Sequence, residues 1–157
     1  GTRYFRLMEL FRITRSEYQD DLSGIGAFYN GGRWNTPRNA MLYTSSHRSL
    51  AMLEVLVHWH KTVTPPNYVI VSLEIPDDMV SVTAPSLVPE WSEDELWSKQ
   101  IGDSWLKAGN SLLLKVPSVV VKAEQNYLVN PMHPDVLSLR ITDIEPLNFD
   151  KRLFKKI

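Results

Sequence analysis

The segment GGRWNTPRNAMLYTSSHRSLAMLEVLVH, residues 31–58, contains a turn, a strand and a helix in one short stretch. Its AMLYTS part (40–45) is an apolar run that predicts a short buried strand. A helix is expected to follow, with Ser45 or Ser46 as its N-cap, because apolar residues recur three and four positions apart. These apolar positions are Leu50, Leu53, Leu56 and Val57. The segment therefore predicts a strand followed directly by an amphipathic helix.

The chain before this segment predicts one strand and one loop. RYFRLMELFR (3–12) places aromatic and aliphatic residues between arginines, a pattern typical of a strand. SGIGAFYNGG (23–32) is rich in glycine and predicts a loop.

The chain after the segment predicts a second strand and a second helix. YVIVSLEIP (68–76) alternates apolar side chains with a period of two, as a strand does. Prolines punctuate the connection over residues 81–89. SEDE (92–95) has the spacing of a capping box and predicts a helix that ends at Gly109. The helix carries Leu96, Trp97, Ile101, Trp105 and Leu106. Trp91, Trp97 and Trp105 are expected in the core, with a contact to an antitoxin or a second copy as the alternative.

The C-terminal part predicts further strands and one more loop. SLLLKVPSVVV (111–121) is divided by Pro117, which predicts a strand edge, bulge or bend at that point. NYLVNPMHPD (126–135) is typical of a loop, and LSLRITDIEPL (137–147) predicts a last strand. Strands and helices mix without regular βαβ alternation, so we expect an α+β fold. The expected architecture is one domain over residues 1–157, with a bent or split mixed β-sheet flanked by helices.

Composition limits the classes of function. The formal net charge is −1, and no segment concentrates Lys or Arg, so direct nucleic-acid binding by this chain is not expected. The sequence contains no cysteine, which excludes disulfides and fits a cytoplasmic location. No apolar run approaches the roughly 20 residues that span a bilayer, so no membrane contact is expected.

The sequence lacks the motifs of several common enzyme and metal-binding classes. His58 and His60 are two residues apart, which on a helix directs them to different faces, and no further ligand set accompanies them. We therefore predict no metal site. The sequence has no GxxxxGK[ST], no GxGxxG between a strand and a helix, and no GxSxG. An enzyme with this sequence would use neither the common nucleotide-binding loops nor an ordinary serine hydrolase triad.

Four residues remain as candidates for a site. Arg33, among glycines, is either an exposed loop arginine or a fork for phosphate or carboxylate. Tyr43 is either a half-buried aromatic at a strand end or a ring that stacks on a planar ligand. Glu54 is the only charge in LAMLEVLVH and lies either on the solvent face of the helix or in a cleft with a partner. Ser118 is either a small residue at a bulge or a site residue.

The motifs GGRWNTP, LYTSSHRSLAMLEVLVH and LLLKVPSVVVKAEQNYLVNPMHPD together resemble the RES domain, the toxin half of RES–Xre toxin–antitoxin pairs. The resemblance covers nearly the whole chain. The arginine, glutamate and serine that give the family its name correspond to Arg33, Glu54 and Ser118. Ser111 and Ser138 lie close enough in the sequence to remain alternatives for the serine.

The resemblance extends to ligand-binding residues. Tyr43 matches the tyrosine eleven residues before the family's glutamate, and Arg6 matches an arginine on the first strand. We predict that Arg6, Arg33 and Tyr43 bind the ligand, together with Asn130 of the segment 126–135.

This family membership would imply a fold similar to ADP-ribosyltransferase toxins and NAD as the substrate. The implied reaction cleaves the nicotinamide–ribose bond, with water or phosphate as acceptor. Two alternatives stay open, namely ADP-ribosyl transfer to a specific protein and a non-catalytic module that binds a nucleotide or an antitoxin. The implied partner is an Xre-type helix-turn-helix antitoxin, and a second copy of the chain is a further candidate.

Overall fold

The computed structural model describes residues 4–82 and 88–154, which contain a seven-stranded mixed sheet and three α-helices. The strands occur in the order β4-β5-β6-β2-β1-β3-β7, and β4 and β5 are parallel while the other neighbours are antiparallel. Their bounds are β1 Leu7–Arg15, β2 Leu42–Ser45, β3 Tyr68–Pro76, β4 Val80–Val82, β5 Leu113–Pro117, β6 Gln125–Val129 and β7 Arg140–Leu147.

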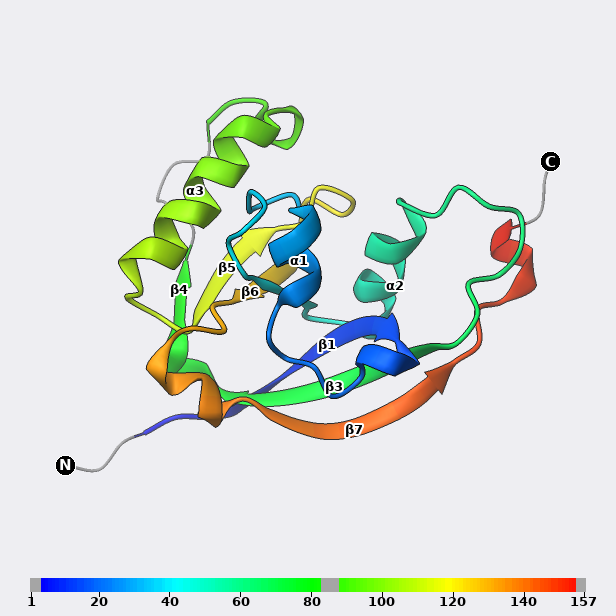
Figure 1. Cartoon of the computed structure of the whole chain (residues 1–157), viewed down its shortest axis with the longest axis horizontal. Coiled ribbons are helices and arrows are strands. Elements are labelled where there is room, and N and C mark those ends of the chain that lie inside the picture. Colours follow the sequence, from blue (N-terminus) through cyan, green and yellow to red (C-terminus); the bar gives the residue numbers. More distant parts are fainter. Residues whose placement is uncertain (1–3, 83–87, 155–157) are drawn as a thin grey trace.

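The sheet is split between β1 and β2. Strands β7, β3 and β1 are long and extensively paired, whereas β1 and β2 are paired only at Phe11 and Ser45 within the described residues. Figure 1 shows the two sets of strands diverging, with α1 (Ile25–Asn30) and α2 (Arg48–Leu56) on the same side of the long strands. The predicted α+β class with a split mixed sheet is confirmed.

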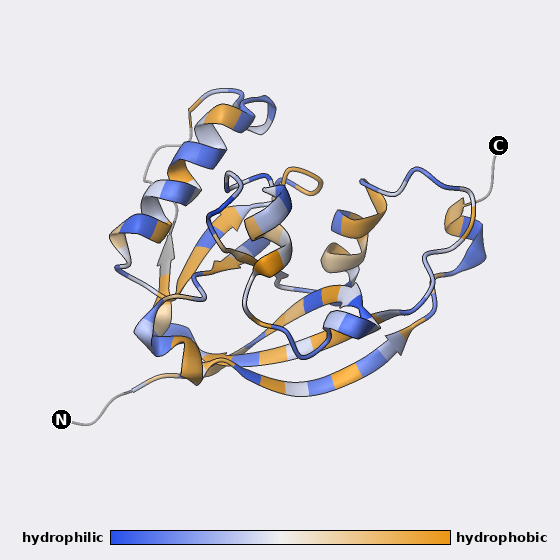
Figure 2. Cartoon of the chain, in the orientation of Figure 1, coloured by the Kyte–Doolittle hydropathy of each residue, from blue (hydrophilic) through white to orange (hydrophobic). Residues whose placement is uncertain are grey.

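The long central strand β3 coincides with the predicted segment 68–76. Nearly all of its residues are buried, because it lies between β1 and β7. Val71, Leu73 and Ile75 enter the main core, while Ile70 enters a second cluster beneath α2. The outer strand β7 alternates hydrophilic and hydrophobic residues along its length (Figure 2), as expected where one face is solvated.

Both predicted long helices are present, but other residues cap them. His47 is the N-cap of α2, because Ser45 is the last residue of β2 and Ser46 lies between strand and cap. Asp94 rather than Ser92 caps α3 (Glu95–Ala108), and its carboxylate accepts a hydrogen bond from Trp97 N. The helix ends at Gly109, which has a φ of 64°, as predicted.

Three predicted boundaries are wrong. The first strand begins at Leu7 instead of residue 3 and continues to Arg15. The predicted loop 23–32 contains α1, whose preceding Gly24 has a left-handed φ of 73° and lies against the backbone of Met41. The predicted loop 126–135 begins with strand β6, because pairing with both β2 and β5 overrides its loop-like composition. The connection 81–89 starts within β4, and its residues 83–87 lie outside the described residues.

Helix α3 packs against the loop that precedes β2. Its Trp97, Ile101, Trp105 and Leu106 contact a buried cluster that includes Trp34. Trp91 packs on the same cluster, so the predicted core position of the three tryptophans is confirmed. Gly102 makes this contact possible, because a Cβ there would lie 1.7 Å from the carbonyl oxygen of Trp34.

Among the described residues, no helix has the length and apolar character needed to cross a bilayer.

Gly102→Ala should destabilise the protein by about 2 kcal/mol, because the added methyl group forces α3 away from the Trp34 loop. Gly26→Ala in α1 is the matched control, since a Cβ there meets no atom within 4 Å. The free energy of unfolding, measured by urea titration, should be unchanged or higher in the control. Equal stability of the two variants would contradict the proposed packing constraint.

Candidate active site

A cavity of about 430 Å³ opens at the junction where β1 and β2 separate. Its walls come from β1, α1, the loop before β2, β2, α2 and β6. Three of the residues predicted from the sequence, Arg33, Tyr43 and Glu54, line it together. The cavity has the size of an ordinary small-ligand site.

Glu54 lies on α2 and is held through one of its two carboxylate oxygens. Its Oε1 accepts hydrogen bonds from Ser118 Oγ at 2.7 Å and from Asn126 Nδ2 at 2.8 Å. Within the described part of the chain, no donor contacts Oε2. The two donors fix the rotamer of the carboxylate, and the second oxygen can receive a ligand.

Ser118 follows the last residue of β5 and is fully buried. Its Oγ accepts hydrogen bonds from the backbone N–H groups of Val120 and Val121, at 3.1 and 3.0 Å, and donates its own proton to Glu54. The two accepted bonds orient the hydroxyl proton toward the carboxylate. Ser118 is absent from the cavity wall, so it acts on a ligand only through Glu54.

The two alternative serines lie elsewhere. Ser111 Oγ accepts a hydrogen bond from Trp105 Nε1 and donates to the carbonyl of Leu113. Ser138 is the last residue of a 3₁₀-helix, Pro134–Ser138, before β7. Of the three serines, Ser118 is the one that the structure brings to Glu54.

Tyr43, on β2, is fixed by two hydrogen bonds of its hydroxyl group. The phenol oxygen accepts from Trp34 N at 2.9 Å and donates to Asn35 Oδ1 at 2.7 Å. Burial raises the pKa of Tyr43 far above its ordinary value, and the N–H of Trp34 opposes this rise. A Cβ on Gly32 would lie 2.5 Å from the phenol oxygen, so the glycine turn permits the loop to pack on the ring.

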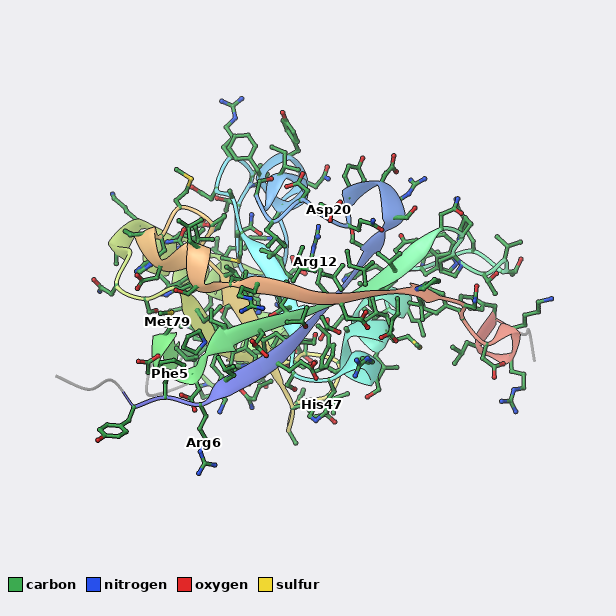
Figure 3. All side chains as sticks on the ribbon, turned by 90° about the horizontal axis from the view of Figure 1, so that it is seen from below. Phe5, Arg6, Arg12, Asp20, His47 and Met79 are labelled. Carbon is green, nitrogen blue, oxygen red and sulfur yellow. The ribbon has the colours of Figure 1, made fainter. Side chains whose placement is uncertain are left out.

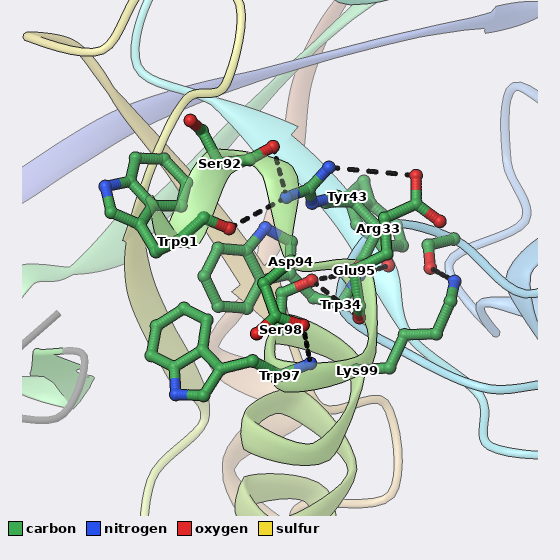
Figure 4. Close-up of polar contacts among 11 residues, drawn as sticks. Arg33, Trp34, Tyr43, Trp91, Ser92, Asp94, Glu95, Trp97, Ser98 and Lys99 are labelled. Atoms are coloured by element: carbon green, nitrogen blue, oxygen red, sulfur yellow. Dashed lines mark hydrogen bonds and ion pairs between the residues drawn. The ribbon is translucent and has the colours of Figure 1, made fainter. Parts of the chain in front are cut away.

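Arg33 connects the cavity wall to the start of α3. Its Nη2 donates to the carbonyl oxygens of Trp91, at 3.0 Å, and Ser92, at 2.6 Å, and its Nη1 lies 3.7 Å from Glu95 Oε1 (Figure 4). The Nε atom is buried and has no hydrogen-bond partner among the described residues. The guanidinium therefore braces the wall through Nη2.

Arg12, which the sequence analysis did not single out, also lines the cavity. It lies on β1 and donates from Nη1 to the carbonyl of Tyr18 at 3.2 Å. Burial lowers the pKa of Arg12, and the negative charge of Asp21 partly opposes this. With Arg33, it gives the cavity lining two arginines and one acidic residue, Glu54, a balance that favours an anionic ligand.

Arg6 and Asn130 do not lie at this cavity. Arg6 precedes β1 and its side chain extends away from the sheet, whereas Arg12 points into the molecule (Figure 3). Six residues of extended chain separate the two, or about 20 Å. Asn130 is buried at the opposite end of β6, where its side chain donates to Leu106 O and accepts from Met132 N. The structure thus separates both residues from Glu54.

Asn126 and Ser45 are site residues that the sequence analysis missed. Both line the cavity, and Ser45 Oγ donates to Asn126 Oδ1 at 2.7 Å while Asn126 donates to Glu54. The sequence signal for Asn126 was a polar residue within QNYLV, a run that can form a strand, but the segment was predicted to be a loop.

Within residues 4–82 and 88–154, His, Asp and Glu side chains form no group of three that could hold a metal ion.

Tyr43→Phe should reduce the dependence of stability on alkaline pH. The native phenol keeps its proton because burial raises its pKa, whereas the unfolded chain loses that proton near pH 10. The unfolded state then binds fewer protons, so the free energy of unfolding of the wild type falls as pH rises, by on the order of 1 kcal/mol per pH unit from this group. Urea titrations between about pH 9 and 11 test this, and equal slopes for wild type and variant would contradict it.

Comparison with known proteins places this chain in a family. The chain matches the family model described as RES domain over residues 9–150. A protein of Sphingobium sp. (strain YBL2) named "Prs ADP-ribosylating toxin" is 36% identical over 148 residues, which cover 90% of this chain and 92% of that protein. A protein of Yersinia enterocolitica named "Toxin Res" is 37% identical over 152 residues, which cover 93% of this chain and 99% of that protein.

The fold is similar to a solved structure as well. The crystal structure of the M. tuberculosis MbcT–MbcA toxin–antitoxin complex superposes with a TM-score of 0.74 and 20% sequence identity, covering 96% of this chain and 88% of that one. This similarity concerns the fold, whereas the family model and the relatives concern the sequence itself. The resemblance noted in the sequence is confirmed, and the chain belongs to the RES domain family.

Proposed function

We propose that this chain is the toxin of a toxin–antitoxin pair and that it consumes NAD by cleaving the nicotinamide–ribose bond. The observation that carries the proposal is the arrangement around Glu54. One oxygen of its carboxylate is fixed by Ser118 and Asn126, and the residue lines a cavity together with Arg12, Arg33 and Tyr43. Membership of the RES domain family and relatives named "Toxin Res" support the same function.

The chemistry of NAD suits a site with one carboxylate. Nicotinamide leaves as a neutral pyridine, so no general acid is needed, unlike ordinary glycoside hydrolysis with its two carboxyl groups. Positive charge develops on the ribose ring as the bond breaks. A carboxylate already oriented toward that ring stabilises the charge without reorganising during the reaction. Glu54 performs this role through Oε2, because Oε1 is occupied by Ser118 and Asn126.

The remaining residues bind the rest of the substrate. The guanidinium groups of Arg12 and Arg33 supply donors for the pyrophosphate or a ribose hydroxyl, a role that suits arginine better than lysine. For Arg33 the donor at hand is Nη1, since Nη2 is engaged by two carbonyl groups and Nε is buried. Tyr43 offers the face of its ring to the nicotinamide, because its hydroxyl is held in the wall by Trp34 and Asn35. Water or phosphate then forms a bond to the anomeric carbon of the ADP-ribosyl group, from which nicotinamide has departed with the bonding electron pair.

Glu54→Gln should lower the rate of nicotinamide release at least ~100-fold, because the amide keeps the shape of the side chain and removes its charge. Purified protein is incubated with NAD, with and without phosphate, and the nicotinamide and its partner product are measured by chromatography. Ser111→Ala is the control, since Ser111 is hydrogen-bonded elsewhere. A wild-type protein that leaves NAD intact with either acceptor would contradict the proposal.

A second candidate function is transfer of ADP-ribose to a specific protein. The observation in its favour is the 36%-identical relative named "Prs ADP-ribosylating toxin". The first half of the reaction is the same, and the acceptor is a protein side chain instead of water or phosphate. Mass spectrometry of a bacterial lysate incubated with isotopically labelled NAD and this chain distinguishes the two. Transfer predicts a labelled protein that is absent with Glu54→Gln, whereas simple cleavage predicts label only in small molecules.

We also propose an Xre-type helix-turn-helix antitoxin as the partner that covers the cavity. The support is that the solved structure with a similar fold is titled as a toxin–antitoxin complex. Adding the protein encoded beside this chain to the NAD assay should suppress nicotinamide release at equimolar ratio. Pairing of two copies of this chain remains a prediction, which light scattering of the isolated protein can test.

A further inference from the structure

Asn126 stands between Ser45 and Glu54, and each of its amide atoms has a defined partner. We propose that Asn126, held by Ser45, is a positioning residue that aims the Glu54 carboxylate at the ribose. This inference rests on the proposed function and adds to it two residues, Asn126 and Ser45, that the sequence motifs did not indicate.

The orientation of the Asn126 amide follows from its neighbours. Ser45 Oγ donates to Asn126 Oδ1 at 2.7 Å, and this bond fixes the oxygen side of the amide. The nitrogen side must then face Glu54, where Nδ2 donates to Oε1 at 2.8 Å. Ser45 is 4% exposed, so water does not compete effectively for the contact. Without Ser45, the oxygen side of the amide would lose this donor, and the amide would be held less firmly against Glu54.

The position of Ser45 is itself fixed by the split of the sheet. Ser45 pairs with Asn126 across β2 and β6, and on its other side it pairs with Phe11 of β1. That second contact is the junction between the two sets of strands. The orientation of Glu54 is therefore tied to the place where the sheet divides and the cavity opens.

Two donors from separate segments converge on the same carboxylate oxygen. Ser118 approaches from the end of β5, and Asn126 approaches from β6. Loss of either donor allows the carboxylate to turn, and misplacement of a catalytic group by about 1 Å can lower a rate on the order of 100-fold. The other titratable or charged side chains that line the cavity are Arg12 from β1, Arg33 from the loop, Tyr43 from β2 and His58 after α2.

Asn126→Asp is the most direct test, because it keeps the shape and replaces the donor with an acceptor. At neutral pH the new carboxylate repels Glu54, and we expect kcat for nicotinamide release to fall about 100-fold while KM changes less than about threefold. At lower pH the introduced carboxyl group takes up a proton and can donate to Glu54 as the amide did. The ratio of variant to wild-type kcat should therefore rise at least about tenfold from pH 8 to pH 5. A residue with a purely structural role would not produce this pH dependence.

Ser45→Ala and Ser45→Thr form a second, milder pair. Alanine removes the donor that orients Asn126, and we expect kcat about tenfold below wild type. Threonine keeps the hydroxyl and suits a strand, so it should restore most of the activity. Circular dichroism confirms that each variant is folded before its kinetics are compared.

The outcomes separate this inference from the proposed function. A wild-type protein that releases no nicotinamide overturns the proposed function. It then also overturns the role of Asn126 in that reaction. An active wild type together with a folded Asn126→Asp variant of unchanged kcat and unchanged pH profile overturns the positioning role alone. A pH-dependent loss in Asn126→Asp, with rescue by threonine at position 45, supports it.

Discussion

The hydrogen bonds to Oε1 of Glu54 are the interactions on which the site depends. Glu54 lies in an otherwise apolar helix, and a carboxylate that is partly removed from water needs compensating donors. Ser118 and Asn126 supply them from the two strand segments that face α2. These contacts hold α2, β5 and β6 in one arrangement and leave the second oxygen of the carboxylate without a donor among the described residues. The same hydrogen bonds that compensate the charge of Glu54 also orient the carboxylate that the proposed reaction uses.

The cavity beside Glu54 exists because the sheet is split between β1 and β2. A continuous sheet would bring β1 and β2 into full pairing and leave no room between them, whereas here they are paired only at Phe11 and Ser45 within the described residues. The loop over residues 31–39 fills one side of the opening and is fixed from behind by α3. Ser98 donates to the carbonyl of Arg33, Asp103 accepts from Thr36, and Gly102 allows the helix to approach the loop. The buried Asn35 organises the same loop from within, through donors to three carbonyls.

The agreement between sequence and structure is uneven for a physical reason. Arg33, Tyr43 and Glu54 lie within one turn–strand–helix unit, so local rules were enough to bring them near one another. Ser118 required a long-range contact to distinguish it from Ser111 and Ser138. Arg6 was chosen because it matches an arginine on the first strand of the family, and the predicted strand 3–12 contains both Arg6 and Arg12. The structure places Arg12 at the cavity instead. Asn126 was assigned to a loop because its strand is defined by pairing with distant partners.

By itself, the sequence determined the α+β class, the central strand over residues 68–76, both long helices and the local group of Arg33, Tyr43 and Glu54. These follow from periodicity, glycine and proline positions and the isolation of one charge in an apolar helix, all of which act over a few residues. Tertiary structure alone decided where the sheet divides, which first-strand arginine enters the cavity, and which donors hold the carboxylate. Those features depend on strand register between segments such as Ser45 and Asn126, which are 81 residues apart, and register is set by packing of the whole chain.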